Sequence, residues 1–433
     1  MKIKMIPRTI LYLVCTLLFQ LLLSNPVLSD ELSEFKAQMQ EMQKENRTLQ
    51  EQWDKQREEM KHLLERIEDL QKKYRSLEKK GHDSQESPME PALTREDVPG
   101  SLDVPQLHIR GFGDVAFSAK FIDSGGESTF TLGSVDLYIT SEITDRLSAL
   151  VEANFNTSSE TNEVTLRLER AHLKYSFSDF LNITLGKMHT PIGYWNQTYH
   201  HGNWLQTTIF RPEIAIPEVN NGAFLPIHQL GIDLSGVKGL GQVDLGYNLG
   251  VFNGRGRTVS EIQGAKDRND SKAIHLHLHL ISHFFEGMRL GANFFHDTIP
   301  TNPSLPARLN PIQELIVGGY FTYLHDRVEV IGELFKIFHE DKVTGQDFNT
   351  LGFYLQGGHK IGQWMPYYRL DFMNVANDDP FFVPPRNNDR VKHTWGLRWD
   401  VFSWNAIKFE YHFTNAKDRS DEHQLAINSS FAF

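Results

Sequence analysis

The chain has 433 residues, a net charge of −11 and 11% aromatic residues, so it is long enough for one large domain or for several small ones. Beyond residue 29 it contains no continuous apolar stretch of about 18 residues, which excludes a transmembrane helix. A chain that spans a membrane without such helices must form a closed β-barrel, because the bilayer core leaves no backbone group unpaired. A soluble protein fits the bulk composition equally well. The patterns along the chain are therefore needed to distinguish a soluble protein from a membrane barrel.

Residues 1–29 are typical of a secretory signal peptide. A basic start is followed by an apolar run from Ile10 to Leu23, and a plausible cleavage site precedes Asp30. An uncleaved anchor is the less favoured alternative, because the run is short and a polar chain follows it. Cys15 is the only cysteine and lies within this run, so the remaining chain can form no disulfide and cannot use thiolate catalysis.

Residues 30–80 carry a heptad repeat, which predicts a helical coiled coil. A helix of this length cannot bury its apolar stripe alone, so the repeat implies an oligomer, although the core residues do not separate a dimer from a trimer. Residues 81–105 are polar and rich in Pro and Gly, which indicates a linker. The expected core positions are Leu32, Phe35, Met39, Met42, Asn46, Leu49, Trp53, Gln56, Met60, Leu63, Ile67, Leu70, Tyr74 and Leu77.

From Gln106 onward the pattern has a period of two. Val243, Leu245 and Tyr247, for example, alternate with Asp244 and polar or small residues. One apolar and one polar face on strands of about ten residues is the pattern of a transmembrane barrel with lipid outside and water inside. We expect residues 106–433 to form an all-β, antiparallel barrel of about sixteen strands, with 14 or 18 strands as alternatives. The expected strands are 106–121, 128–143, 146–157, 163–177, 180–189, 227–237, 241–254, 271–284, 287–298, 312–325, 327–340, 347–361, 363–375, 390–403, 405–415 and 421–433.

The connections and the last residues support a barrel in the outer membrane. Every second connection is tight, and the others are longer and rich in Gly, Asn, Asp and Pro. Bacterial barrels place short turns in the periplasm and long loops outside. The chain also ends in an alternating strand that finishes with Phe433, which resembles the terminal strand signature of bacterial outer-membrane barrels.

One hairpin carries a family resemblance. The stretch Leu185-Gly186-Lys187-Met188-His189-Thr190-Pro191-Ile192-Gly193, which follows the strand from Arg170 to Tyr175, resembles the corresponding hairpin of the phosphate-selective porin O and P family. The helical prefix resembles that of trimeric porins of the neighbouring dicarboxylate type. The resemblance implies a sixteen-stranded trimeric channel and leaves the solute open.

The longest connection, residues 190–226, is the third long loop, and in sixteen-stranded porins this loop folds into the lumen and narrows it. Its aromatic, amide and imidazole groups suit a constriction that sorts hydrated solutes. The alternative is a loop that packs on the barrel rim or on a partner subunit. The residues expected to line the constriction are Tyr194, Trp195, His200, His201, Arg211 and Glu213.

Alternation also predicts which charges face the lumen. Basic groups outnumber acidic ones among them, which favours anions slightly, although the barrel segment as a whole is acidic. A bulge near Glu169 is assumed, because residues 165–175 do not keep one register. The expected lumen charges are Arg110, Arg170, Lys174, Arg289, Arg369, Asp371, Lys392, Arg398 and Lys408.

Other candidate chemistry is weaker. His275, His277 and His279 lie on one strand face, but a spacing of about 7 Å per step is too wide for all three to hold one metal ion unaided. We therefore expect a polar lumen ladder and no metal. No nucleophile, base or phosphate-binding loop stands in a catalytic setting, so we expect no enzyme activity, no cofactor and no nucleic-acid partner.

Together these patterns predict a homotrimeric porin in the outer membrane of a Gram-negative bacterium, with its coiled coil in the periplasm. Small hydrophilic solutes, with a slight expected preference for anions, would diffuse passively through it, and outer-membrane lipid would surround it. The alternative is an outer-membrane anchor that tethers the envelope or a periplasmic partner through the coiled coil.

Overall fold

The computed structural model describes residues 106–122, 125–157, 163–199, 202–217, 223–302, 310–382 and 388–433. The expected signal peptide (1–29), coiled coil (30–80) and linker (81–105) lie outside these residues. No helix in the described part of the chain is long and apolar enough to cross a bilayer.

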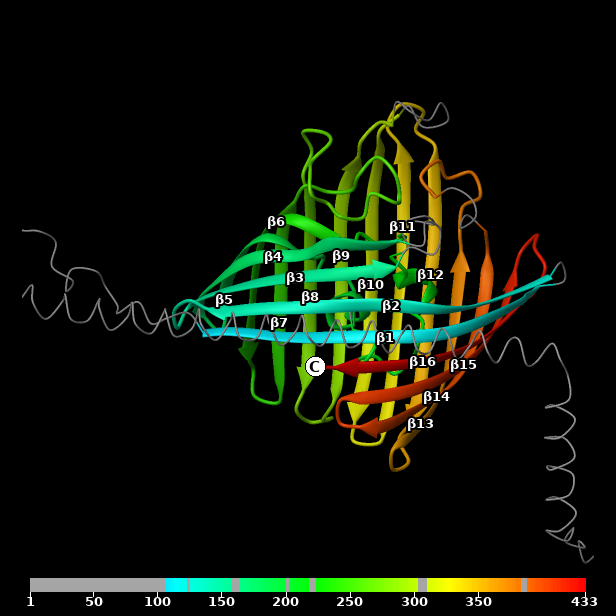
Figure 1. Cartoon of the computed structure of the whole chain (residues 1–433). Coiled ribbons are helices and arrows are strands. Elements are labelled where there is room, and N and C mark those ends of the chain that lie inside the picture. Colours follow the sequence, from blue (N-terminus) through cyan, green and yellow to red (C-terminus); the bar gives the residue numbers. More distant parts are fainter. Residues whose placement is uncertain are drawn as a thin grey trace, which may run out of the picture. The chain divides into compact units, whose positions relative to one another are not determined.

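The described residues form a closed barrel of sixteen antiparallel strands, in which each strand pairs with its neighbours in sequence and β1 pairs with β16 (Figure 1). This confirms the predicted all-β barrel and its strand count. The strands are β1 (Gln106–Ile122), β2 (Gly125–Glu142), β3 (Leu147–Thr157), β4 (Val164–Ser178), β5 (Leu181–His189), β6 (His228–Gly239), β7 (Val243–Phe252), β8 (Ala273–Ser282), β9 (Met288–Ile299), β10 (Ile312–His325), β11 (Val328–Asp341), β12 (Asp347–His359), β13 (Trp364–Asn374), β14 (Arg390–Phe402), β15 (Asn405–Ala416) and β16 (Glu422–Ala432).

The barrel has two unlike ends. At one end, the short-turn end, the connections are residues 143–146, 179–180, 240–242, 283–287, 326–327, 360–363 and 403–404. The other end, the long-loop end, carries residues 190–227 and 253–272 among its connections. One expectation is wrong here: β1 and β2 extend to Ile122 and Gly125, so their connection is shorter than the loop of residues 122–127 that the sequence indicated. The ladder continues because Lys120 pairs with Glu127 and Phe121 with Gly126.

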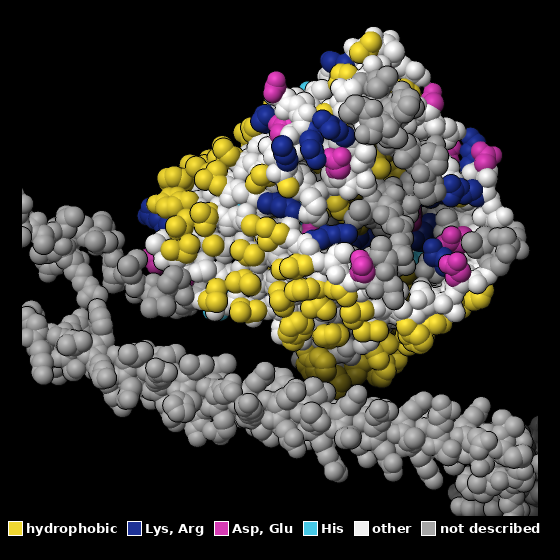
Figure 2. Space-filling view, turned by 45° about the horizontal axis from the view of Figure 1, so that its top comes forward, with side chains coloured by type: hydrophobic (Ala, Val, Ile, Leu, Met, Phe, Trp, Pro, Cys, Tyr) yellow, Lys and Arg dark blue, Asp and Glu magenta, His cyan; other side chains and the backbone are white. Residues whose placement is uncertain are grey.

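Burial along the strands follows the predicted alternation. On β8, His275 and His277 are buried, whereas Ile274, Leu276 and Leu278 are 45%, 36% and 43% exposed. A soluble protein shows the opposite arrangement, with apolar side chains inside. Figure 2 shows hydrophobic side chains gathered over the outer wall. This inverted pattern is that of a barrel with a lipid-facing exterior and a polar interior.

The irregular positions also have clear causes. In the β3–β4 ladder Glu152 pairs with Arg170 and Ala153 pairs with Leu168, so Glu169 is the extra residue of a bulge, as the sequence predicted.

The barrel closes at a seam where β1 meets β16 and the last residue of the chain. There the Phe433 N–H donates to the Gly111 carbonyl at 2.9 Å, and the Gly111 N–H donates back to the Phe433 carbonyl at 2.8 Å. A Cβ at Gly111 would lie 2.3 Å from the Phe433 ring, so a glycine leaves room for the terminal aromatic residue at the seam.

Candidate functional site

In the third connection at the long-loop end, the described residues 190–199, 202–217 and 223–227 lie inside the barrel. It contains the short helix α3 (Tyr194–Thr198) and the 3₁₀ helix η1 (Glu213–Ala215). We call this segment the lumen loop. Its backbone hydrogen-bonds to inward-facing side chains of β9, β11, β13, β14 and β15, so it lies against that half of the wall.

The first contact of the lumen loop is with Glu333 on β11. Its two carboxylate oxygens accept the backbone N–H groups of Tyr194 at 2.7 Å and Trp195 at 2.8 Å, and the Tyr354 hydroxyl donates to it at 2.7 Å. The preceding residue, Gly193, has a φ of 71°, and a Cβ there would lie 2.3 Å from the Glu333 carboxylate. Only glycine adopts this conformation without strain and leaves room for the carboxylate.

Arg369 on β13 holds the middle of the lumen loop. Its guanidinium donates to the carbonyl of Phe210 at 2.9 Å and to the carbonyl of Arg211 at 3.0 Å. The Asp371 carboxylate accepts from the same guanidinium at 2.9 Å, and the whole Arg369 side chain is buried. The charge is therefore paired and hydrogen-bonded, as a buried cation requires.

Lys408 and Arg398 hold the preceding stretch in the same way. The Lys408 ammonium donates to the carbonyls of Gln206 at 2.7 Å and Thr208 at 3.1 Å. The Arg398 guanidinium donates to the carbonyls of Trp204 at 2.9 Å and Gln206 at 2.8 Å. The lumen loop is thus fixed through its backbone, so its side chains do not have to provide these contacts.

Carboxylates complete the attachment. Glu410 on β15 accepts the backbone N–H of Ile209 at 2.7 Å. Within η1, the Glu213 carboxylate pairs with Arg390 at 2.7 Å and with Lys392 at 3.2 Å, both on β14. The wall therefore contributes charges of both signs to the attachment of the lumen loop.

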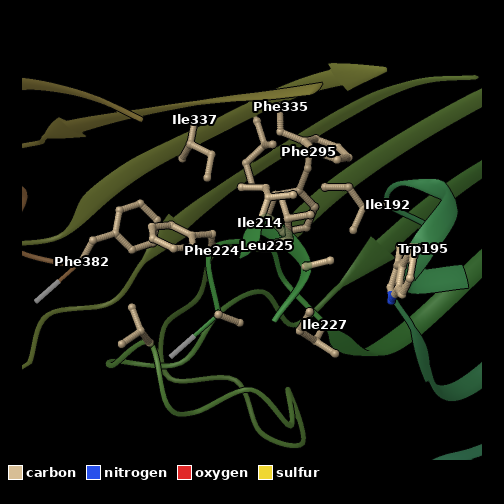
Figure 3. Close-up of a cluster of buried hydrophobic side chains, with 14 of the residues drawn as sticks. Ile192, Trp195, Ile214, Phe224, Leu225, Ile227, Phe295, Phe335, Ile337 and Phe382 are labelled. Atoms are coloured by element: carbon tan, nitrogen blue, oxygen red, sulfur yellow. The ribbon is translucent and has the colours of Figure 1, made fainter. Parts of the chain in front are cut away.

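An apolar cluster lies beneath the lumen loop (Figure 3). Fully burying each large side chain contributes about 1.5–3 kcal/mol, so this cluster stabilises the loop against the wall more than any single polar contact. It joins lumen-loop residues Ile192, Trp195, Ile214, Phe224, Leu225 and Ile227 to wall and neighbouring-loop residues Phe295, Phe335, Ile337 and Phe382.

The residues expected to line the constriction have different positions. Tyr194, Trp195 and Glu213 are only 7%, 1% and 8% exposed, so they fix the lumen loop and present little surface to the lumen. This differs from the expectation because aromatic groups in a loop can pack downward as well as face water. His200 and His201 lie outside the described residues.

Arg211 is the partly exposed member of the set. Its guanidinium lies near enough to the carboxylates of Asp136, Glu169 and Glu152 to interact with them electrostatically. Arg211 therefore stays charged at neutral pH and faces the acidic residues of β2, β3 and β4. The lumen between the loop and this wall carries a cation on one side and carboxylates on the other.

The predicted lumen charges fall into two groups. Arg369, Asp371, Lys392 and Lys408 are buried beneath the lumen loop, and Arg398 is bonded to it. Arg170 and Lys174 on β4 are partly exposed, and Arg170 is paired with Glu152. Arg110 on β1 and Arg289 on β9 are exposed. Alternation placed these side chains on the inner face but could not show which of them the loop would cover.

The sequence analysis missed Glu333 and Asp136 as parts of the site. Both are buried and face inward by the same alternation that identified the basic residues. Glu333 holds the start of the lumen loop, and Asp136 faces Arg211. The alternation of β2 and β11 is the signal that could have identified them, since it places both side chains on the inner face.

The histidine ladder lies close to α3. The ring nitrogens of His277 lie 3.3 Å from the Asn248 amide oxygen and 3.2 Å from the Tyr320 hydroxyl. The rings of His277 and His279 stack with centroids 5.0 Å apart. Across the described ranges, no three His, Cys, Asp or Glu side chains are grouped so that they could hold a metal ion.

No family model matches the chain, and no curated protein sequence matches it. Among solved structures, it is similar to the anion-selective porin from Comamonas acidovorans, with 13% identity and a TM-score of 0.53 over 76% of this chain and 100% of that chain. OmpT of Vibrio cholerae in its trimer form gives 11% identity and a TM-score of 0.51 over 76% and 99% of the two chains. OmpF of Salmonella typhi in complex with daunomycin gives 12% identity and a TM-score of 0.52 over 76% of this chain and 98% of that chain. These likenesses show the fold, a closed barrel like those of bacterial porins, whereas membership of the phosphate-selective O and P family stays a prediction.

Proposed function

We propose that the protein is an outer-membrane porin through which small hydrophilic solutes diffuse passively. The observation that carries this proposal is the lumen loop, which hydrogen-bonds to the inward-facing Glu333, Arg369, Lys408 and Glu410. We infer that it narrows the polar interior. The apolar exterior supports a position in the membrane. By the usual orientation of such barrels, the long-loop end faces outward and the short-turn end faces the periplasm.

The direct test is planar-bilayer conductance of the purified full-length chain. A porin gives stepwise current increments as single barrels insert, because the water-filled lumen conducts ions. Absence of such steps from folded protein would contradict the proposal and favour the alternative function, an envelope anchor that acts through the coiled coil.

Our proposal includes a modest preference for anions. The buried cations Arg369, Lys392 and Lys408 contribute little to it, because loop carbonyls and carboxylates already pair with them. The preference therefore rests on cations that reach the lumen water. Arg110, Lys174 and Arg289 lie near the short-turn ends of β1, β4 and β9, where they would attract anions from the periplasmic side.

Selectivity gives a testable prediction. The double variant Lys174→Gln/Arg289→Gln should shift the reversal potential in a KCl gradient toward that of a cation-preferring pore, because it removes two lumen charges without disturbing the lumen loop. The control Arg327→Gln removes one exposed charge from a turn at the short-turn rim and should leave the potential unchanged. A double variant with the wild-type potential would show that these residues do not set selectivity.

We also propose that the protein is a homotrimer whose coiled coil extends into the periplasm. The heptad repeat of residues 30–80 supports an oligomer, and one of the similar solved structures is described as a trimer form. Dicarboxylate-type porins, which the prefix resembles, are trimeric as well.

Oligomerisation gives a second prediction. The variant Leu63→Asp/Ile67→Asp places two charges in the predicted core stripe and should lower the fraction of trimer in sedimentation velocity of the detergent-solubilised chain. Arg66→Asp lies outside the stripe and should sediment as wild type. If both variants remain trimeric, the barrel alone holds the subunits together.

A further inference from the structure

A second site lies at the long-loop end, in a connection whose other residues contact the lumen loop: the Arg255 guanidinium donates to the Ala223 carbonyl at 3.0 Å, and the Val259 carbonyl accepts the Ala223 N–H at 3.3 Å. The connection between β7 and β8, residues 253–272, folds against the end of β9 and leaves a cavity of about 330 Å³. No residue that holds the lumen loop contributes to it. The polar residues around it are Arg257, Arg268, Asn269, Ser271, Thr298 and Thr301.

The cavity opens on the outer surface of the barrel. On β9, Asp297 and Ile299 are buried and face inward, so Thr298 between them faces outward. Four residues earlier on the same face, Phe294 is 40% exposed, and on the neighbouring β8 strand Ile274 is 45% exposed. The cavity therefore lies just beyond the apolar wall, at the level where lipid head groups surround a barrel in a bilayer.

The walls of this cavity are held in place by hydrogen bonds. The Asn269 amide donates to the Thr298 carbonyl at 2.6 Å, and the Asn269 side-chain oxygen accepts the Ser271 N–H at 3.0 Å. Residues 269–271 are thereby fixed to β9. The hydroxyls of Ser271, Thr298 and Thr301 make no hydrogen bond within the described residues, so they are available to a ligand.

The charge of the cavity identifies the ligand class. Two guanidinium groups, of Arg257 and Arg268, line it and no carboxylate does. Glu261, which does not line the cavity, pairs with Arg268 at 3.7 Å, and its carboxylate accepts the Arg257 backbone N–H at 3.3 Å. In the same connection Lys272 is paired with Asp267, and the charges of Lys266 and Asp270 are opposite, so the two arginines remain the cations that line the cavity. Guanidinium forks combined with hydroxyl donors match the oxygens of a phosphate group.

We propose that this cavity binds the phosphate of an anionic lipid in the outer leaflet. Basic pockets at the membrane surface recognise lipid phosphates in this way. Exposed apolar residues such as Ile274 and Phe294 lie on the same side, where they would contact the acyl chains. The site lies outside the lumen, so it does not depend on which solutes the pore conducts.

The test is lipid binding to the purified full-length chain by native mass spectrometry, with diphosphorylated lipid A as the probe. Arg257→Gln/Arg268→Gln should weaken binding by about tenfold or more, since hydrogen bonds between charged groups are lost. The control Arg327→Gln/Lys342→Gln removes the same charge from two exposed turns and should bind as wild type. Equal binding by the two double variants would overturn the proposal.

Two further measurements separate this proposal from simpler explanations. Inorganic phosphate at the concentration of the lipid should not displace lipid A, because it lacks the acyl contacts; displacement would assign the cavity to free phosphate and overturn the lipid assignment. Arg268→Gln alone, at an exposed position that leaves folding intact, should still reduce binding, and an unchanged affinity would also count against the site. Wild-type conductance in both Arg variants is expected, so failure here is distinguishable from failure of the porin proposal.

Discussion

Replacing Arg369 by Met should release the middle of the lumen loop and increase the single-channel conductance. The substitution keeps a long side chain but leaves the carbonyls of Phe210 and Arg211 without their donor and the Asp371 carboxylate without its cation. Removing one partner of a buried ion pair costs about 3–5 kcal/mol. Thermal unfolding should therefore occur at a lower temperature, while the widened lumen carries more current.

The matched control is Arg327→Met, which removes an exposed arginine from the turn between β10 and β11. It should change neither the conductance nor the melting temperature. An Arg369→Met channel with wild-type conductance and wild-type stability would show that the lumen loop does not depend on this contact.

Replacing Gly193 by Val should displace the start of the lumen loop. Gly193 has a φ of 71° and a ψ of 168°, a conformation that essentially only glycine adopts, and it costs a residue with a side chain about 1–3 kcal/mol. The new Cβ would also lie 2.3 Å from the Glu333 carboxylate, which accepts the N–H groups of Tyr194 and Trp195. Each buried N–H left without an acceptor adds about 1–3 kcal/mol. We expect a lower melting temperature and larger, noisier single-channel currents.

Gly357→Val provides the control for this substitution. Gly357 lies within β12 with an ordinary φ, and a Cβ there would meet no atom within 4 Å. This variant should fold and conduct as wild type. If Gly193→Val behaved in the same way, the close approach of Glu333 to the loop backbone would have no role in holding it.

The strands could be predicted almost completely from the sequence, because alternation is a local property. The range 312–325 agrees with the observed β10 residue for residue, and the extra residue near Glu169 appeared as a break in the period. The apolar and polar faces of β8 were likewise readable from the order of its Ile, Leu and His residues.

The path of the lumen loop could not be predicted, because it depends on contacts between distant parts of the chain. The alternation of β13 shows that Arg369 points inward but not that backbone carbonyls of residues 210 and 211 meet it there. Trp195 is equally suited to line a pore or to fill an apolar cluster, and its environment is set by β11 and β12 residues more than 130 positions away. For the same reason, a count of the inward cations gives too high a value for the positive charge that solutes meet, because the lumen loop covers several of these cations.

The most direct test of the account is the single-channel current of the variant Arg211→Cys before and after a positively charged methanethiosulfonate reagent is added. No other thiol should react with the reagent, because Cys15 is the only cysteine in the sequence and lies in the predicted signal peptide. If the partly exposed Arg211 lies at the narrow part of a conducting lumen, the reagent should reduce each current step permanently, whereas Trp195→Cys, buried beneath the loop, should not respond. Unchanged currents in Arg211→Cys after complete labelling would contradict a constriction formed by this loop.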